Sequence, residues 1–173
     1  ELIDLLWDGI TVEAGLKRLK VVIYFLRQQL NKVTPDGADP FLIRNGEFYA
    51  LDPRRLSVDV ANFEHLVDRA MELRANRRPA PALECFEKAI SLYGGSFMAE
   101  EIYSDWCALE RERLRERYLD SLATLASMYS AALRWEDSIA AYRKALAIDS
   151  CREALHGNLM HALIASGRPD EAV

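Results

Sequence analysis

The sequence predicts a mostly α-helical chain in which two helices and a β-hairpin precede repeated helix pairs. Only eight glycines and six prolines interrupt 173 residues, and 50% of the residues are hydrophobic, which is ample for a packed core. Apolar residues recur at alternating steps of three and four, the spacing of a helix with one buried face. One stretch also matches another that follows it by about 34 residues, which indicates a structural repeat.

The first two elements are helices. One covers Glu1 to Trp7 and is broken by Asp8-Gly9. Thr11 caps a second helix that runs to about Lys32, and Glu13 supplies the acid that favours its first turn. The apolar residues of this second helix form one stripe that we expect to be buried: Leu16, Leu19, Ile23, Leu26 and Leu30.

A β-hairpin follows the second helix. Asn45-Gly46 is the strongest short hairpin signal, and it lies between Phe41 to Arg44 and Glu47 to Leu51. Pro35-Asp36-Gly37 marks a turn before the hairpin, and Pro53 marks its end. Two helices followed by a two-stranded hairpin are the order of parts in a winged helix-turn-helix, in which the second helix enters the major groove.

From about Val60 onward the chain is predicted to be helical. The first helix of this part spans Val60 to Arg74 and carries one apolar face: Phe63, Leu66, Val67, Ala70 and Met71.

Overlaying the chain on itself reveals the repeat. Arg134 to Ile139 matches Arg168 to Val173 at an offset of about 34 residues, the period of tetratricopeptide helix pairs. An earlier copy, in which Ala82 takes the place of Ser138, is displaced by one such period plus an insert. The repeated positions are Leu66, Ala70, Leu73, Ala82, Phe86 and Ala89, then Leu122, Leu125, Ala126, Tyr129, Ser138, Tyr142 and Ala145, then Leu159, Met160, Leu163 and Ala172.

The insert begins at Gly94-Gly95 and continues into a long helical stretch from about Ala99. Between Glu110 and Arg117, acids and arginines alternate on the solvated side, so that Glu110 can pair with Arg113 and Glu112 with Arg115. The apolar anchors of this stretch are predicted to be Ile102, Trp106, Leu109 and Leu114.

Positive charge is concentrated in the second helix. The whole chain has a formal net charge of -5, but Leu16 to Lys32 contains five basic residues and no acid. Lys and Arg neutralise DNA phosphates, and side chains that point away from the core can reach base edges. The residues predicted to face DNA are Lys17, Arg18, Lys20, Val21, Tyr24 and Phe25, with Arg44 on the wing contacting the DNA backbone. An ordinary solvated helix face would carry the same cations, and on this pattern the two interpretations are even.

Other classes of site are disfavoured. Three cysteines at wide spacings, Cys85, Cys107 and Cys151, each sit in an apolar helical pattern and predict free thiols in a reducing, cytoplasmic compartment. Cys151, His156 and His161 are five residues apart and share no helix face, so we expect no metal site. His65 stands alone, and no Ser or Cys has an evident base nearby in the sequence, so we expect no catalysis and no cofactor. We also expect no membrane segment. Both ends read as interrupted helices, so we expect a piece of a longer protein.

The whole chain resembles a response-regulator-type winged helix followed by the bacterial transcriptional activator domain, as in the Streptomyces antibiotic regulatory proteins. The winged helix is incomplete, because the strands and first helix that normally precede it are absent here. The matching residues are Leu19 to Ile23, Leu26-Arg27, Gly46, Leu51, Val58 to Val60, Phe63-Glu64, Ala70, Ala89, Leu92-Tyr93, Gly95, Trp106, Arg111, Leu114, Tyr118, Leu122, Leu125-Ala126, Ile139, Ala145-Leu146, Asp149, Arg152 to Ala154, Met160 and Gly167-Arg168.

The resemblance implies a DNA-binding transcription activator. Residues 1-53 would be the C-terminal part of the winged helix and residues 54-173 the tetratricopeptide-like activator domain. Its partners would be promoter DNA, RNA polymerase or other transcription machinery, and a second copy in a homodimer. The family usually has a small polar and then a basic residue where this chain has Tyr24-Phe25, and aromatic groups can contact thymine methyls instead. The alternative is a protein-interaction module of a multidomain signalling regulator that does not bind DNA directly.

Overall fold

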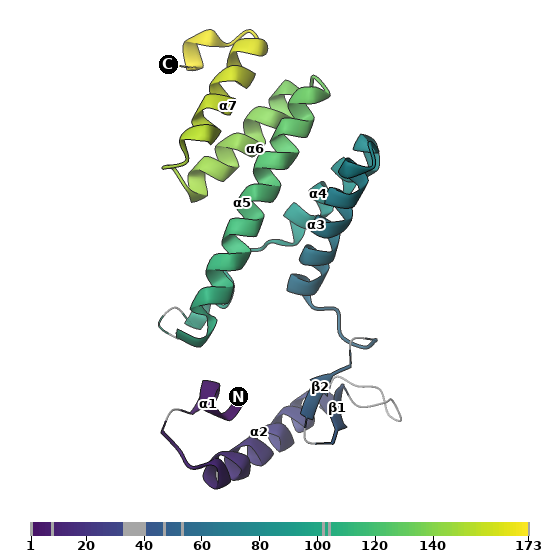
Figure 1. Ribbon diagram of the computed structural model, residues 1–173, viewed down its shortest axis with the longest axis vertical. Coiled ribbons are helices and arrows are strands. Elements are labelled where there is room, and N and C mark those ends of the chain that lie inside the picture. Colours follow the sequence, from purple (N-terminus) through teal and green to yellow (C-terminus); the bar gives the residue numbers. More distant parts are fainter. Residues whose placement is uncertain are drawn as a thin grey trace. The chain divides into compact units, whose positions relative to one another are not determined.

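The structure is a computed structural model that describes residues 2–7, 9–32, 41–46, 48–52, 54–101, 103 and 105–172. The chain divides into two compact units, Glu1–Val58 and Asp59–Val173, and each is described by itself. It is mostly helical with one small antiparallel sheet, as the sequence predicts (Figure 1). The turn expected at Pro35-Asp36-Gly37, together with Pro53 and Ile102, lies outside the described residues.

The first unit contains two helices and a hairpin. These are α1 (Leu2–Leu6), α2 (Val12–Lys32), β1 (Leu42–Asn45) and β2 (Phe48–Leu51). Its core is small, because it is centred on three buried side chains, with further apolar residues of α1 and β2 packed against them. These core residues are Leu19, Ile23 and Leu42, then Ile3, Trp7 and Tyr49.

The buried face of α2 is narrower than the sequence predicts. Leu19 and Ile23 are buried, but Leu16 is 47% exposed and Leu26 is 39% exposed, so the expectation of a fully buried stripe was wrong for these two. The buried positions Gly15, Leu19 and Ile23 are four residues apart and follow one line along the helix. A five-residue α1 and a short hairpin cover only this line.

Gly15 allows α1 to approach α2 closely. A Cβ added at Gly15 would lie 2.3 Å from Ile3 Cγ2 and 3.2 Å from Ile10 Cδ1. Real Cβ atoms do not come this close to other side chains, so a larger residue would push the two helices apart. The close approach therefore depends on glycine.

The hairpin forms where the sequence predicts it. β1 and β2 are antiparallel, and their closing pair is Asn45 with Phe48. Gly46 follows Asn45 with a φ of 63°, the left-handed conformation that two-residue hairpin loops require. The loop therefore begins at Gly46, one residue later than an Asn45-Gly46 turn would place it.

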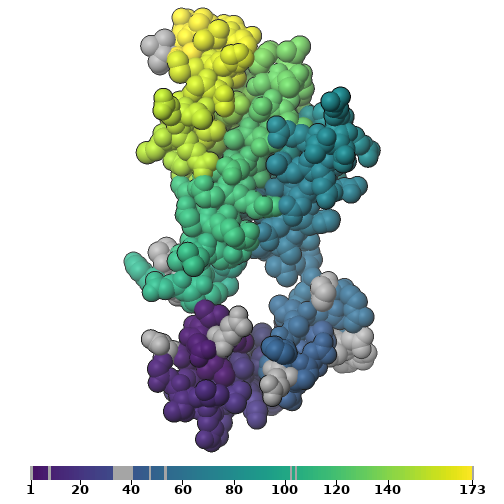
Figure 2. Space-filling model, viewed as in Figure 1, coloured from purple at the N-terminus to yellow at the C-terminus, as the bar shows by residue number. Residues whose placement is uncertain are grey.

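The second unit is a series of antiparallel helices. These are α3 (Asp59–Ala75), α4 (Pro79–Leu92), α5 (Ala108–Ala131), α6 (Trp135–Ile148) and α7 (Glu153–Ala165), with short 3-10 helices η1 (Ala99–Glu101), η2 (Asp105–Cys107) and η3 (Pro169–Glu171). In Figure 1, α6 lies beside the C-terminal part of α5. Figure 2 shows that the helices of this unit, coloured blue, green and yellow along the chain, pack against one another as one continuous body.

The repeated positions form the core of this unit. All seven residues of the second copy are buried, and Ser138 has no exposed surface. In the earlier copy, Phe86 is also fully buried, whereas Met71 on the apolar face predicted for α3 is 47% exposed. In the third copy, Leu163 is buried but Met160 is 46% exposed. The repeat pattern thus predicts the core well, and it fails only on helix faces that point outward.

The turns within the helix pairs repeat as closely as the sequence does. Three turns share a hydrogen bond from an arginine N–H to the carbonyl five residues earlier: Arg78 to Leu73 at 2.9 Å, Arg134 to Tyr129 at 2.9 Å and Arg168 to Leu163 at 2.8 Å. The residue before each arginine has a positive φ, with 56° at Arg77, 58° at Leu133 and 82° at Gly167. The three arginines are separated by the same offsets as the three copies of the sequence repeat.

The insert differs from the expected long helix. Two 3-10 turns precede α5, which starts only at Ala108. Trp106 is 44% exposed and Leu109 is 87% exposed, so their assignment as anchors was wrong, while Leu114 is buried as predicted. Cys107 is the buried anchor instead, because it lies seven residues before Leu114 and shares its side, whereas Leu109, five residues before Leu114, is about 140° away around α5.

Arg111 holds the insert against α5. Its guanidinium donates to the carbonyls of Phe97 at 2.9 Å, Met98 at 3.2 Å and Glu101 at 2.9 Å. A fourth contact, at 3.0 Å, reaches Cys107 Sγ. One planar group with several donors thus binds three backbone carbonyls of the insert.

Three aromatic rings join α5 to the first helix pair. Tyr93, which follows α4, stacks on Tyr118 of α5 with ring centroids 3.9 Å apart and planes 9° from parallel. Phe63 of α3 lies 5.8 Å from Tyr93 and 6.4 Å from Tyr118. Offset and tilted aromatic contacts of this kind stabilise the core beyond their buried area. The first helix pair and α5 therefore share one core.

Candidate functional site

The N-terminus of α2 is capped as predicted. The backbone N–H of Ala14 donates to Thr11 Oγ1 at 3.3 Å, and Lys17 Nζ lies 2.8 Å from Glu13 Oε1. The cap satisfies one of the first-turn donors, and the ion pair lies on the exposed side of the helix. Lys17 is thereby held at the beginning of the basic face.

The residues predicted to face DNA are all exposed. Leu19 and Ile23 point into the core of the first unit, so the opposite side of α2 faces away from that core. Three large apolar side chains stand on this side: Val21 is 54% exposed, Tyr24 58% and Phe25 55%. The cationic side chains that accompany them are Lys17, Arg18 and Lys20. The structure therefore brings the six helical residues of the prediction to the outer face and flanks of one helix.

Tyr24 contacts two neighbours. Its hydroxyl accepts a hydrogen bond from Gln28 Nε2 at 2.8 Å, and its ring meets Phe25 edge to face with centroids 5.7 Å apart. The two aromatic rings thus form one contact pair on the exposed face of α2.

Arg44 lies on the hairpin, as predicted, but its side chain is engaged locally. Its Nε donates to Gly46 O at 2.9 Å, and its guanidinium lies 5.9 Å from the centre of the Tyr49 ring. Arg44 itself is exposed. A positive charge is therefore held beside the hairpin loop.

A shallow hollow of about 490 Å³ forms on the same unit. It is lined by Trp7, which follows α1, and by Lys17, Arg18, Val21 and Val22 of α2. Sequence reasoning missed Trp7 as a site residue. The signal that places Trp7 beside α2 is its spacing of four residues from Ile3, one helical turn.

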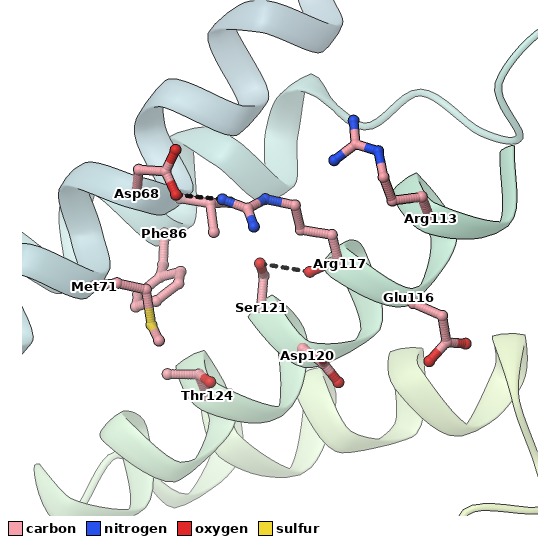
Figure 3. Close-up of a pocket in the computed structure, with 10 residues that line it drawn as sticks. Asp68, Met71, Phe86, Arg113, Glu116, Arg117, Asp120, Ser121 and Thr124 are labelled. Atoms are coloured by element: carbon pink, nitrogen blue, oxygen red, sulfur yellow. Dashed lines mark hydrogen bonds and ion pairs between the residues drawn. The ribbon is translucent and has the colours of Figure 1, made fainter. Parts of the chain in front are cut away.

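A second hollow of about 490 Å³ lies in the second unit, and we call it the α3/α5 groove. Its lining residues are Val67, Asp68 and Met71 of α3, Phe86 of α4, and Arg113, Glu116, Arg117, Asp120, Ser121 and Thr124 of α5. Figure 3 shows Arg117 reaching from α5 towards Asp68, with which it forms an ion pair.

Ion pairs cross the α3/α5 groove one helical turn apart. Arg113 Nη1 lies 2.6 Å from Glu64 Oε1, and Arg117 pairs with Asp68. Arg113 also binds Glu110 at 2.6 Å, and this hydrogen bond lowers the pKa of Glu110. The pair of Glu110 with Arg113 confirms the sequence prediction, whereas the links to α3 were missed because their partners are 49 residues apart.

Arg152 binds two carboxylates of α5 that line the α3/α5 groove. Its guanidinium binds Asp120 at 3.0 Å and Asp149 at 3.1 Å, and it also pairs with Glu116. The predicted pair of Glu112 with Arg115 is present at 3.0 Å. Carboxylates and guanidiniums therefore alternate across the exposed surface of α5.

Residues 58–173 match the model of the bacterial transcriptional activator domain. The chain belongs to this family. The match contains α3 to η3, and with them the α3/α5 groove. No curated protein shows a significant match to the chain. As a member of a family of transcriptional activator domains, the chain has a role in transcription regulation.

Potential metal ligands do not gather at one place in the part of the chain that the structure describes. Among the described residues, no cluster of three or more His, Cys, Asp or Glu side chains could hold a metal ion. His156 Nε2 lies 2.8 Å from Ser150 O, which ties the ring to the turn before α7. Cys85, Cys107 and Cys151 form no disulfide with one another, and Cys151 is exposed rather than part of an apolar helix face. No helix of the described part is long and apolar enough to span a bilayer.

Proposed function

We propose that this chain is part of a DNA-binding transcription activator in which α1, α2 and the hairpin belong to a winged helix-turn-helix. The observation that carries the proposal is the exposed face of α2, opposite its buried line and followed in the chain by the β1–β2 hairpin. A recognition helix needs such a face, because one side must be packed while the other enters the major groove. Promoter DNA is the proposed ligand, and the chain acts without a catalytic step or a cofactor.

The chemistry of the face suits this role. Lys17, Arg18 and Lys20 can neutralise phosphates, while Val21, Tyr24 and Phe25 can contact thymine methyls. Arg44, held beside the hairpin loop, is placed to contact the DNA backbone as a wing residue does.

The second unit is proposed to be a tetratricopeptide-like array. The sequence repeat and the recurring turn geometry at Leu133 and Gly167 support this. Arrays of this kind bind partners through extended surfaces. We propose that this unit contacts RNA polymerase or other transcription machinery and contributes to a homodimer in the cytoplasm.

Fluorescence anisotropy with labelled promoter DNA at several salt concentrations tests DNA binding. We expect the affinity to fall steeply with salt, and Lys17→Ala and Lys20→Ala each to reduce the logarithmic salt slope by about one. Lys88→Ala, on α4 of the other unit, is the matched control and should leave the slope unchanged. A flat salt dependence of the unsubstituted chain would rule out the proposal.

A second candidate function is a protein-interaction module. The hollow between Trp7 and Val22 favours it, since an exposed apolar surface can be covered by a protein partner. In that case Val21→Ser would weaken a protein complex while the chain showed no salt-dependent DNA binding. The same titration therefore separates the two functions.

A further inference from the structure

We propose that the α3/α5 groove binds a basic peptide segment of a partner protein, with one large apolar side chain of that segment in the groove. The groove belongs to the second unit, and α2 takes no part in it. The inference therefore does not depend on DNA binding by the first unit.

The floor of the groove is apolar and partly open. Met71 is 47% exposed there, beside Val67 and the fully buried Phe86. Figure 3 shows Met71 and Phe86 below the Arg117 side chain, on the side towards α3. A hollow of about 490 Å³ is within the range of ligand sites and can hold a large apolar side chain. Burying Met71 against such a side chain would be favourable.

The arginines of the groove are already neutralised. Arg117 is paired with Asp68, and Arg113 is bound by both Glu64 and Glu110. An anionic ligand would have to displace these carboxylates. The groove is therefore a poor site for an acidic peptide or a phosphate.

Carboxylates of the groove remain accessible to a cation. The side chain of Asp68 is 66% exposed and that of Asp120 is 73% exposed. The hydrogen bond that each receives goes to its Oδ1, so that Oδ2 can accept a bond from a Lys or Arg of the ligand. A peptide with a Lys or Arg beside one large apolar side chain would therefore bind both these carboxylates and the apolar floor of the groove.

The net charge of the second unit also favours a basic ligand. Residues 59–173 contain 14 basic and 19 acidic residues, a net charge of -5, whereas residues 1–58 contain eight of each and have none. The entire net charge of the chain therefore lies in the unit that contains the groove. A negative unit attracts cationic partners over distance and speeds their association.

Two short fluorescent peptides test the proposal on the unsubstituted chain. Both carry Leu and Phe in the same pattern, one with Lys and Arg between them and the other with Glu. We expect the basic peptide to bind, with an affinity that falls as salt increases, and the acidic peptide not to bind. Equal binding of the two peptides, or binding of the acidic one alone, would overturn the proposal.

Matched substitutions then locate the binding. Asp120→Asn should weaken the basic peptide roughly threefold, the usual size of an exposed ion pair. Its control is Glu84→Gln, which removes one exposed carboxylate from α4 outside the groove. Met71→Ser should weaken binding at least as much, and its control is Met160→Ser, because Met160 is 46% exposed on α7. Circular dichroism checks that each variant is folded.

The controls decide the outcome. If Glu84→Gln and Asp120→Asn reduce the affinity equally, the peptide responds only to net charge and the proposal is wrong. If Met71→Ser leaves peptide affinity unchanged but shifts the sedimentation of the chain towards monomer, the groove is covered by a second copy and the proposal is again wrong.

Discussion

Arg113 Nη1 on α5 lies 2.6 Å from Glu64 Oε1 on α3. This ion pair joins two helices that are separated along the chain by α4 and the insert. The Arg113 and Glu64 side chains are 47% and 31% exposed, so the pair is partly shielded from water. A double-mutant cycle with Glu64→Gln and Arg113→Met should give a coupling of about 0.5 to 1 kcal/mol by urea denaturation.

Lys17 and Glu13 provide the comparison for this cycle. Their side chains are 75% and 81% exposed and lie on one helix, so their coupling should be only about 0.2 to 0.5 kcal/mol. High salt should weaken both couplings. A coupling of Arg113 with Glu64 no larger than that of Lys17 with Glu13 would contradict the idea that this pair stabilises the placement of α3 on α5.

Gly15→Ala should destabilise the first unit. The new Cβ would meet Ile3 Cγ2 at 2.3 Å, and such overpacking costs about 1 to 3 kcal/mol, whereas Ala in a helix contributes about 0.5 to 1 kcal/mol relative to Gly. The net loss of about 1 kcal/mol should appear as faster hydrogen exchange at the amides of α2.

Gly157→Ala is the matched control for this substitution. Gly157 also lies within a helix, but a Cβ there meets nothing within 4 Å. This variant should therefore slow hydrogen exchange in α7. If both variants changed exchange in the same direction, the contact of Gly15 with Ile3 would not be the cause.

Much of the fold could be predicted because its signals are local. Thr11 caps α2 as expected, and Asn45 closes the hairpin within one residue of the predicted turn. The repeat also located core residues that no single helix pattern would identify. Ser138 is one of them, since its buried hydroxyl donates to Ala126 O at 2.9 Å and lies 2.7 Å from Ser130 Oγ.

The two main errors have different causes. Leu109 and Leu114 are five residues apart, about 140° around a helix, so they cannot share one buried face of α5, whereas Cys107, seven residues before Leu114, lies on the same side and is buried. The α3/α5 groove was missed for another reason. Arg113 was correctly paired with Glu110 one turn away, but its partner Glu64 can be found only when the helices are placed in space.

Asp52 should make the first unit sensitive to acid. Hydrogen bonds from the Arg54 side chain, at 3.0 and 2.7 Å, and from its backbone N–H lower the pKa of Asp52 from 3.8 to about 2. The unfolded chain therefore takes up a proton before the folded one does. The stability that this carboxylate contributes is present above pH 3.8 and is lost as the pH falls towards 2.

An NMR titration of the Asp52 carboxyl carbon tests this. Its midpoint should lie at about pH 2 and should move up in Arg54→Met, which removes the side-chain donors. Asp52→Asn should abolish the corresponding change in stability between roughly pH 4 and pH 2. A midpoint near 3.8 in the unsubstituted chain would show that Arg54 does not hold the carboxylate.

Leu133→Gly should stabilise the second unit, although it removes a large apolar side chain. Leu133 has a φ of 58° and is 72% exposed, so it adopts a left-handed conformation without burying much surface. That conformation costs an L-residue about 1 to 2 kcal/mol, which Gly does not incur. The greater conformational freedom of Gly in the unfolded chain offsets about 0.4 to 1 kcal/mol of this gain. The midpoint of urea unfolding should therefore rise by the equivalent of about 0.5 to 1 kcal/mol.

The repeat itself supplies the reverse experiment. Gly167 occupies the equivalent turn with a φ of 82°, and a Cβ there would meet nothing within 4 Å, so Gly167→Leu should destabilise through the backbone alone, by about 1 kcal/mol. Leu109→Gly removes a leucine that is even more exposed, 87% against 72%, from the first turn of α5 and should also destabilise, because Gly weakens a helix. Opposite signs for the two leucine-to-glycine substitutions would show that the left-handed turn, rather than loss of the side chain, determines the result; equal signs would rule this out.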